Sequence, residues 1–419
     1  MARLGNSIDV AVIGAGPYGL SLTAHLRARG IEHRIFGEPM GPWKNNMPPG
    51  MLLKSYPWAS SLSDPKSELT ARNFCTERAL PYHDELMPLP LSRFVEYGEA
   101  FQARYAPNVE RKTLIALEPG PAGFRASFSD GETVNARRVV VAVGLYPFKR
   151  LPREVEHLPA DLCSHSSEYG SIGTLLGKNV VVVGAGSSAT DLAALLHEQG
   201  IPVSLVTRTP HLNFACRPRP RTVFERVTAP MSGIGNGWTM AACARYPQLI
   251  RLLREDQRVR LANSPVHGPM SSAFMRDRVI GKIPLLSDRS LTGIEIRNGR
   301  VVLDLTANDG TSQQSLRADH VVFATGYEID ITRLGFLDER LTNRIRRIER
   351  APLLSAHYES SVPGLHFIGP VAANSFGPVC RFVYGASHPA RHLARYLSSV
   401  VPRIRPTTKL HPVESTVLS

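Results

Sequence analysis

Short apolar runs alternate along the chain with longer stretches of helical periodicity. Residues 8–13 and 180–183 are apolar almost throughout and rich in β-branched side chains, and each run is followed by a glycine-bearing turn and an apolar helical stretch. Continuous apolar runs of this kind are typical of strands buried on both faces of a parallel sheet. The pattern therefore predicts two strand–helix–strand units, over 7–40 and 178–208.

The same reading predicts the remaining elements. Helical spacing indicates helices over 91–105, 239–254 and 379–397. Several other runs predict strands, and Asn298-Gly299 between two of them is a strong hairpin turn. These predicted strands cover 109–115, 124–128, 133–143, 292–297, 300–306, 319–324 and 366–368.

The two turns that follow the first apolar runs share a glycine pattern, Gly14-Ala15-Gly16-Pro17-Tyr18-Gly19 and Gly184-Ala185-Gly186-Ser187-Ser188-Ala189. In each loop the first glycine allows a tight turn and the second lets the backbone approach a pyrophosphate, while the small third residue (Gly19 or Ala189) keeps the helix close to the strand. The pyrophosphate lies on N–H groups at the helix N-terminus, where the helix dipole favours negative charge. One such loop can be an ordinary structural turn, but two in matching contexts predict a chain that binds two dinucleotides.

The residue 19 positions after each loop distinguishes the two nucleotides. Glu38 stands 19 residues after Gly19, and Arg208 stands 19 residues after Ala189. A carboxylate at this place accepts hydrogen bonds from ribose hydroxyls and repels a 2′-phosphate, whereas an arginine pairs with that phosphate. The first site therefore suits FAD and the second suits NADPH. The alternative, that either residue is an ordinary solvated loop charge, stays open at this point.

The order of the elements does not suit two domains in series. The apolar run 321–324 resembles 139–143, and the last strand and helix need a sheet to join. We therefore predict an α/β fold with two Rossmann-like dinucleotide-binding domains, the NADPH domain being inserted into the FAD domain. The expected division is a first part of the FAD domain at 1–165, an NADPH domain at 166–309, a second part of the FAD domain at 310–400, and a flexible tail at 401–419.

Composition narrows the class of protein. The chain of 419 residues has room for two or three domains, and its net charge of +13 suits a protein that binds two anionic dinucleotides. Nucleic-acid binding is disfavoured because no compact lysine-rich run or nucleic-acid motif accompanies the charge. We find no signal-peptide pattern and no apolar stretch of the roughly 20 residues that a membrane span needs. We therefore expect a cytoplasmic protein without a membrane span, and a homo-oligomer is left open.

The five cysteines, at positions 75, 163, 216, 243 and 380, include no CxxC pair, and no Cys/His set has the spacing of a zinc site. We therefore expect no bound metal. Flavoproteins that bind two dinucleotides and reduce disulfides need a redox-active cysteine pair. The absence of such a pair disfavours disulfide reduction.

With these features the chain resembles the class B flavoprotein monooxygenases, which include the flavin-containing, N-hydroxylating and Baeyer–Villiger monooxygenases. The resemblance covers nearly the whole chain. It rests on both glycine loops and on three further motifs, His165-Ser166-Ser167-Glu168-Tyr169, Thr207-Arg208-Thr209-Pro210 and Phe323-Ala324-Thr325-Gly326-Tyr327.

Departures from the family pattern bear on the subclass. The family fingerprint before the histidine is Phe-x-Gly-x-x-x-His, and Pro159 and Asp161 stand at its first and third positions. Tyr169 stands where flavin-containing and N-hydroxylating enzymes carry Tyr or Phe and Baeyer–Villiger enzymes carry Trp. Trp43 follows Gly41-Pro42, which is similar to the family's Gly-Gly-x-Trp, but the aromatic-rich continuation of the Baeyer–Villiger enzymes is missing. These features favour oxygenation of nitrogen or sulfur over oxidation of ketones.

The resemblance implies an NADPH- and O2-dependent monooxygenase that acts on a small molecule. In the family, NADPH reduces FAD, and a C4a-(hydro)peroxyflavin formed with O2 oxygenates the substrate while the protein excludes water. Two alternatives stay open, a Baeyer–Villiger monooxygenase and an FAD-containing NADPH reductase that passes electrons to a partner protein.

The resemblance also implies which side chains meet the cofactors. The segment that follows Trp43 is expected along the flavin edge, where Lys54 or Ser55 would form hydrogen bonds with the flavin or with the amide of NADP+. The alternative, a surface lysine and a turn serine, stays open at this point. The turn after the last strand is expected to face the flavin pyrimidine and contains Gly369, Asn374 and Ser375. Lys54, Ser55 and Asn374 are the candidate catalytic residues. Further expected cofactor contacts are Gly144, His165, Thr325, Gly326 and Tyr327.

Overall fold

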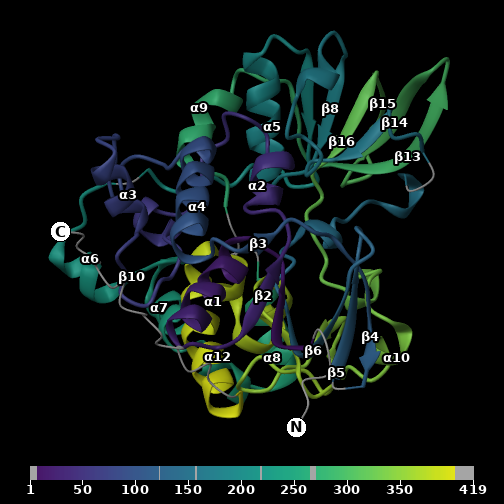
Figure 1. Cartoon of the computed structure of the whole chain (residues 1–419). Helices are drawn as coiled ribbons and strands as arrows, with labels where there is room; N and C mark the ends of the chain where they lie inside the picture. The colour runs from purple at the N-terminus through teal and green to yellow at the C-terminus, as the bar shows by residue number, and fades with distance from the viewer. Residues whose placement is uncertain (1–6, 122, 156–157, 218, 265–269, 402–419) are drawn as a thin grey trace, which may run out of the picture.

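The computed structural model describes residues 7–401, apart from 122, 156–157, 218 and 265–269. The tail that the sequence predicts from 401 onward lies outside the described residues except for its first position. Two largely parallel sheets organise the described chain, one in the lower half of Figure 1 and one in the upper half.

The first sheet has seven strands in the order β3-β2-β1-β6-β5-β4, and β19 also pairs with β6. The strands β3, β2, β1, β6 and β19 are parallel neighbours, whereas β5 and β4 are joined to this sheet in antiparallel fashion. The strands are β1 (Ser7–Ile13), β2 (His33–Phe36), β3 (Val109–Glu110), β4 (Leu114–Gly120), β5 (Gly123–Phe128), β6 (Thr133–Val141) and β19 (Leu365–Phe367).

The helix α1 (Pro17–Ala28) begins directly after the first glycine loop. Gly16 is its N-cap and Pro17 is its first residue, where the fixed φ of proline favours a helix start. The helix packs against α4 (Leu91–Tyr105) and α12 (Ser387–Val400), so the beginning and the end of the chain share the largest apolar core.

The second sheet has the order β12-β9-β8-β16-β7, and its strands are parallel. Val180 and Val182 belong to the core that includes α5 (Ser187–Glu198), whereas Val181 belongs to the core shared with the antiparallel sheet β13-β14-β15. Because neighbouring residues of a strand point to opposite faces, the sheet is covered on both sides, as its apolar runs predict. The strands are β7 (Cys163–His165), β8 (Val180–Val183), β9 (Val203–Val206), β12 (Leu285–Leu286), β13 (Arg289–Arg297), β14 (Arg300–Ala307), β15 (Gln313–Ala318) and β16 (His320–Phe323).

The strand pairing shows an inserted second unit, because the chain leaves the first sheet after β6 and returns to it with β19. It also moves two expected boundaries. The strand β16 lies between β8 and β7, so the return to the first sheet comes after Phe323 and not near 310. The strand β7 already belongs to the second sheet, although the predicted first part extends to 165. Apolar composition places β16 in the interior of a sheet but cannot say which of two sheets it joins.

The closing helix begins later than the sequence predicts. Residues 378–386 form two 3-10 turns, η10 (Pro378–Arg381) and η11 (Val383–Ala386), and α12 starts only at Ser387. The hydroxyl of Tyr18 donates to the carbonyl oxygens of Cys380 at 2.9 Å and Phe382 at 2.8 Å. These carbonyls are therefore bonded across the fold instead of within a helix.

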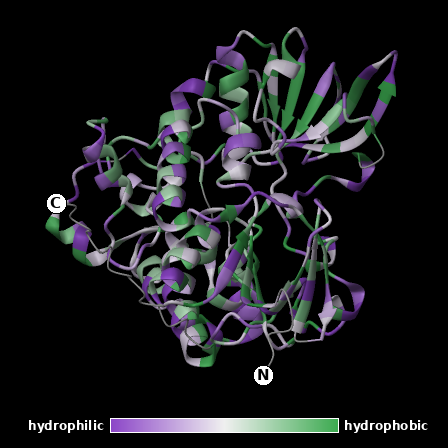
Figure 2. Cartoon of the chain, viewed as in Figure 1, coloured by the Kyte–Doolittle hydropathy of each residue, from purple (hydrophilic) through white to green (hydrophobic). Residues whose placement is uncertain are grey.

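The remaining elements are short. Figure 2 shows hydrophobic residues concentrated in the strands of the second sheet. Among the described residues, no helix is long and apolar enough to cross a membrane. These elements are α2 (Gly41–Asn45), α3 (Ala71–Glu77), α6 (Val223–Thr228), α7 (Trp238–Arg245), α8 (Glu255–Asn263), α9 (Arg276–Val279), α10 (Glu339–Thr342), α11 (Ala373–Phe376), and the hairpins β10 (Met231–Ser232) with β11 (Gly235–Asn236) and β17 (Arg347–Ile348) with β18 (Ala351–Pro352).

Candidate functional site

The first glycine loop has the backbone that its sequence predicts. Gly14 has a φ of +115°, and a Cβ there would lie 2.4 Å from the carbonyl oxygen of Ala142, so a side chain does not fit. A Cβ at Gly19 would lie 1.8 Å from the carbonyl oxygen of Gly14. A Cβ at Gly16, by contrast, would meet no atom within 4 Å. The loop therefore leaves an open cradle at the N-terminus of α1, which fits a pyrophosphate.

The second glycine loop repeats this geometry at the start of α5. Gly184 has a φ of +151°, and a Cβ there would lie 2.5 Å from the carbonyl oxygen of Ala324. A Cβ at Gly186 would meet nothing within 4 Å. Ala189 is fully buried, so its methyl group occupies the place of the third glycine. This loop also fits a dinucleotide.

One cavity of about 520 Å³ extends from the first loop to the second, with walls from Gly14 and Gly16 on one side and Ser187 and Ser188 on the other. Its volume lies within the range of cofactor and small-molecule sites. The expected contacts that line it are Gly14, Gly16, Pro17, Glu38, Trp43, Lys54, Ser55, Gly144, Ser187, Ser188, Tyr327 and Gly369. The expected contacts outside its lining are Gly19, His165, Gly184, Gly186, Ala189, Arg208, Thr325, Gly326, Asn374 and Ser375.

Glu38 lines the cavity just after β2. Its Oε1 accepts a hydrogen bond from Lys44 Nζ at 2.7 Å and lies 3.4 Å from a guanidinium nitrogen of Arg111. Both contacts use the same oxygen. Among the described residues Oε2 accepts no hydrogen bond, so this oxygen can accept hydrogen bonds from a ribose.

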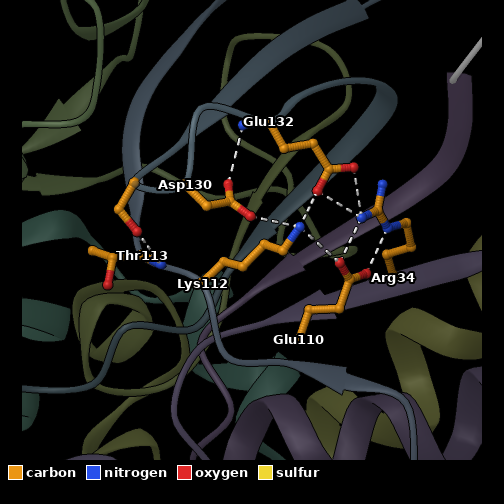
Figure 3. A network of polar contacts seen from close by, with 7 residues as sticks. Arg34, Glu110, Lys112, Thr113, Asp130 and Glu132 are labelled. Atoms are coloured by element: carbon orange, nitrogen blue, oxygen red, sulfur yellow. Dashed lines mark hydrogen bonds and ion pairs between the residues drawn. The ribbon is translucent and has the colours of Figure 1, made fainter.

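A network of charged residues supports the wall next to this carboxylate (Figure 3). Arg34 on β2 donates to both oxygens of Glu110 at 2.6 and 2.5 Å and to Glu132 at 2.9 Å. Lys112, which lines the cavity, pairs with Asp130 at 2.8 Å and with Glu132. Hydrogen bonds to Asp130 and Glu132 raise the pKa of Lys112. The network ties β2, β3 and the β5–β6 turn together at one end of the cavity.

Lys54 contributes a contact between the two units that the sequence does not predict. Its ammonium group forms an ion pair with Asp191 of α5 and also donates to the carbonyl of Leu52 at 2.6 Å. The carboxyl of Asp191 is almost fully buried, and burial raises its pKa although Lys54 opposes the shift. Its second oxygen, Oδ1, is buried without a hydrogen-bond partner. Both residues line the cavity, so an orphaned acceptor lies where the two units meet.

His165 lies behind the cavity wall. The backbone N–H of Ser167 donates to its Nδ1 at 3.1 Å, so Nε2 carries the proton and donates to the carbonyl of Gly326 at 3.1 Å. Burial lowers the pKa of His165 to about 4, so the ring is neutral near pH 7. Ser167 and Tyr327 do line the cavity, and the ring of His165 contacts Tyr327 at 5.2 Å between centroids. His165 therefore positions the wall and is not itself part of it.

Asn374 and Ser375 are placed differently from the expectation. Both are buried on α11 and line no part of the cavity. Asn374 donates to the carbonyl of Ile348 at 3.4 Å, and Ser375 accepts from the backbone N–H of Leu354 at 3.1 Å. Their hydrogen bonds thus hold the segment around β17 and β18, because the chain turns inward after Gly369. Thr325 likewise bonds within the protein, to the carbonyl of Arg150.

Arg208 lies outside the cavity, in the exposed loop after β9. Its backbone carbonyl accepts a hydrogen bond from Asn308 at 2.7 Å, which fixes the loop. No carboxylate among the described residues forms an ion pair with its guanidinium. The side chain is therefore available to a phosphate at the edge of the second unit.

The sequence does not predict several of the residues that line the cavity. Asp191 stands three and four residues after Ser188 and Ser187, so helical spacing could have placed it on the same face of α5. Ser167 belongs to the motif His165–Tyr169, in which the sequence predicts only His165 as a cofactor contact. Cys380 and Arg381 also line the cavity, and no local signal marks them, because they come from a turn that resembled a helix.

The profile of the pyridine nucleotide-disulphide oxidoreductase family matches residues 11–225, which is just over half of the chain. The chain belongs to this family. The match begins in β1 and includes both glycine loops, so it covers the two elements on which the cavity is built.

Related proteins indicate the class of enzyme within this family. An indole-3-pyruvate monooxygenase of Oryza sativa subsp. japonica is 28% identical over 347 residues, which cover 76% of this chain and 77% of that protein. The FAD-dependent urate hydroxylase of Xanthomonas campestris is 25% identical over 338 residues, which cover 78% and 67%. These relatives are flavin-dependent monooxygenases, so the predicted resemblance to the class B enzymes is confirmed.

Solved structures share the whole fold. The ornithine N-hydroxylase of Kutzneria sp. 744 superposes with a TM-score of 0.75 at 16% identity, covering 94% of this chain and 99% of that one. The cadaverine monooxygenase of Erwinia amylovora has a TM-score of 0.72 at 17% identity, covering 98% and 99%. The predicted fold class, two Rossmann-like units with the second inserted into the first, is thereby confirmed.

Proposed function

We propose that the chain is an NADPH- and O2-dependent flavoprotein monooxygenase that oxygenates a nitrogen or sulfur atom of a small molecule. The enzyme class and its cofactors, FAD and NADPH, agree with the relatives. The observation that carries the proposal is one cavity whose lining includes Gly14 and Gly16 of the first loop and Ser187 and Ser188 of the second. The first loop would hold a flavin and the second a nicotinamide on the walls of one space, and hydride transfer between the two would then need no partner protein.

The residues divide the work of binding between the two units. The cradle at Gly16 would hold the FAD pyrophosphate, and Glu38 its ribose. The cradle at Gly186 would hold the NADP pyrophosphate, and Arg208 the 2′-phosphate. When bound, FAD would accept a hydride from NADPH and react with O2. The protein would bind, orient and exclude water.

The pair Lys54–Asp191 would orient the nicotinamide. Buried acceptors without a donor are costly, so Oδ1 of Asp191 calls for an N–H group from a ligand. A carboxamide NH2 supplies such a donor, and the ion pair with Lys54 favours the charged form of the carboxyl against the effect of burial.

The family name raises disulfide reduction as a rival, and the cysteines argue against it. All five are free, and Cys380 is the cysteine that lines the cavity. Burial raises the pKa of Cys380 to about 12, so its thiol stays protonated near neutral pH. Because thiol–disulfide exchange requires a thiolate, this lone cysteine does not support it.

Amines are the substrates that the neighbours favour. The structures that share the fold include an ornithine N-hydroxylase, a cadaverine monooxygenase and an L-lysine 6-monooxygenase. The test is to follow NADPH oxidation by the FAD-loaded enzyme with a panel of amines, sulfides and ketones, and to measure product and hydrogen peroxide together. Coupling of NADPH use to a hydroxylamine or sulfoxide supports the proposal. Stoichiometric peroxide with every compound, or ester formation, contradicts it.

A further inference from the structure

Arg381 ends the 3-10 turn η10 and faces the cavity. The turn is held in place by the hydroxyl of Tyr18, which bonds to the carbonyl oxygens of the residues on either side, Cys380 and Phe382. The lining of the cavity also includes Ser60, Leu53 and Val383. Its position is set by the fold and does not depend on a mobile surface segment.

Arg381 has no counter-ion in the part of the chain that the structure describes. Its Nη1 donates to the backbone carbonyl of Ala262 on α8 at 3.1 Å, and among the described residues no carboxylate lies within ion-pair distance. The other basic residues of the cavity wall differ in this respect, because Lys54 pairs with Asp191 and Lys112 with Asp130 and Glu132. Burial lowers the pKa of Arg381, and no nearby acid offsets that effect.

Two further arginines lie on or next to α8 but do not line the cavity. The helix α8 carries the buried Arg258, and Arg251 is half-buried just before it. Burial, followed by the repulsion from Arg258, lowers the pKa of Arg251.

The guanidinium of Arg381 has more donors than the one hydrogen bond to Ala262 uses, and that bond does not need a positive charge. A neutral amide could donate to one carbonyl, whereas a half-buried cation without a counter-ion is destabilising. The planar fork of arginine matches a carboxylate or a phosphate through two parallel hydrogen bonds. The unused donors of Arg381 therefore point to an anionic ligand group.

We propose that Arg381 binds an anionic group inside the cavity and that this group is the carboxylate of the substrate. The inference rests on the proposed function and narrows it to carboxylate-bearing compounds. A phosphate of a bound cofactor has the same chemistry and is the other possible source, so the experiment must separate the two.

The test uses the FAD-loaded enzyme and pairs of compounds that differ in one carboxylate. L-lysine is compared with cadaverine, and indole-3-acetate with indole-3-acetamide, by titrating the visible absorbance of the flavin. We expect at least tenfold tighter binding of the acid in one pair or both. Arg381→Gln, which removes the positive charge and keeps an amide donor, should abolish that preference, and Arg381→Lys should keep part of it.

Arg251→Gln is the matched control, because Arg251 also donates to a backbone carbonyl, that of Leu354, but lies outside the cavity. This variant should keep the preference for acids. Two results overturn the proposal: no acid preference in either pair, or an unchanged preference in Arg381→Gln. Loss of FAD affinity in Arg381→Gln with the acid preference intact assigns the residue to the cofactor. Binding needs no turnover, so this test can succeed even if coupled oxygenation fails.

Discussion

At the scale of single residues, burial decides which charged side chains contribute strongly to stability. Lys54 and Asp191 come from different units, and the side chain of Asp191 is only 2% exposed. Surface ion pairs contribute little to stability, but removal of one partner of a buried pair leaves an uncompensated charge. The two residues should therefore behave as a pair and not as independent surface charges.

We expect Lys54→Met to lower the free energy of unfolding by about 3 kcal/mol, because Asp191 loses its counter-ion. The double variant Lys54→Met/Asp191→Asn should recover most of that loss. Urea denaturation of the four proteins of the cycle measures the coupling. Additive effects of the two substitutions would contradict the pairing.

Arg208 can be tested separately, since it is exposed and makes no ion pair among the described residues. We expect Arg208→Ala to raise the KM for NADPH roughly ten- to hundredfold, which corresponds to the loss of charge-assisted hydrogen bonds to the 2′-phosphate. The KM for NADH, which has no such phosphate, should change little. Steady-state kinetics with both coenzymes decides, and an equal rise for both would exclude the proposed role.

At the scale of elements, the two kinds of glycine in the first loop have opposite consequences. A Cβ at Gly19 would clash with the carbonyl of Gly14 at 1.8 Å, whereas a Cβ at Gly16 would enter empty space. The helix-packing glycine therefore matters to the folded chain, and the cradle glycine matters to the ligand.

We expect Gly19→Ala to destabilise the protein even without cofactor, and Gly16→Ala to leave the stability of the cofactor-free protein within about 1 kcal/mol. Gly16→Ala should instead weaken FAD binding at least tenfold, because its methyl group would occupy the pyrophosphate cradle. Thermal unfolding without cofactor and fluorescence titration with FAD separate the two effects. Gly186→Ala should repeat the second pattern for NADP+.

The elements that the sequence predicts well are those whose local pattern and environment agree. The helix α4 and the strands β1 and β8 form where their hydrophobic periodicity predicts, because the apolar residues of each are buried in a core. The errors arise where a distant residue decides. Tyr18 holds residues 378–382 in a turn where the spacing favours a helix, and pairing with β8 assigns β16 to the second sheet. For the same reason the sequence wrongly predicts Asn374 as a cavity residue and does not predict Arg381 as one. Local sequence does not show which distant residues surround a turn.

At the scale of the whole molecule, buried neutral histidines make stability depend on pH. Burial lowers the pKa of both His25 and His165 to about 4, and it also lowers the pKa of His366 and His388. In the unfolded chain these rings titrate near 6.5, so below that pH the unfolded state binds more protons than the folded state. Stability should be fully present above pH 6.5 and fall as the pH is lowered toward 4.

The expected loss at pH 5 is on the order of 2 kcal/mol for each of His25 and His165, relative to pH 7.5. Denaturant titrations of the cofactor-free protein at both pH values measure the total. His165→Asn removes one titrating ring and should flatten the dependence, whereas the same substitution at the exposed His211 should not. A stability that is equal at the two pH values would contradict the burial of neutral rings.

The cavity has walls from both units, and this has a thermodynamic consequence. Two ligands that share a wall cannot bind independently unless their contacts leave that wall unchanged. If occupation of the first loop aligns Asp191 for the second ligand, then occupation of the second loop must favour the first ligand by the same factor. A measurement of how NADP+ changes the affinity for FAD would therefore also report how FAD changes the affinity for NADP+, without a separate experiment.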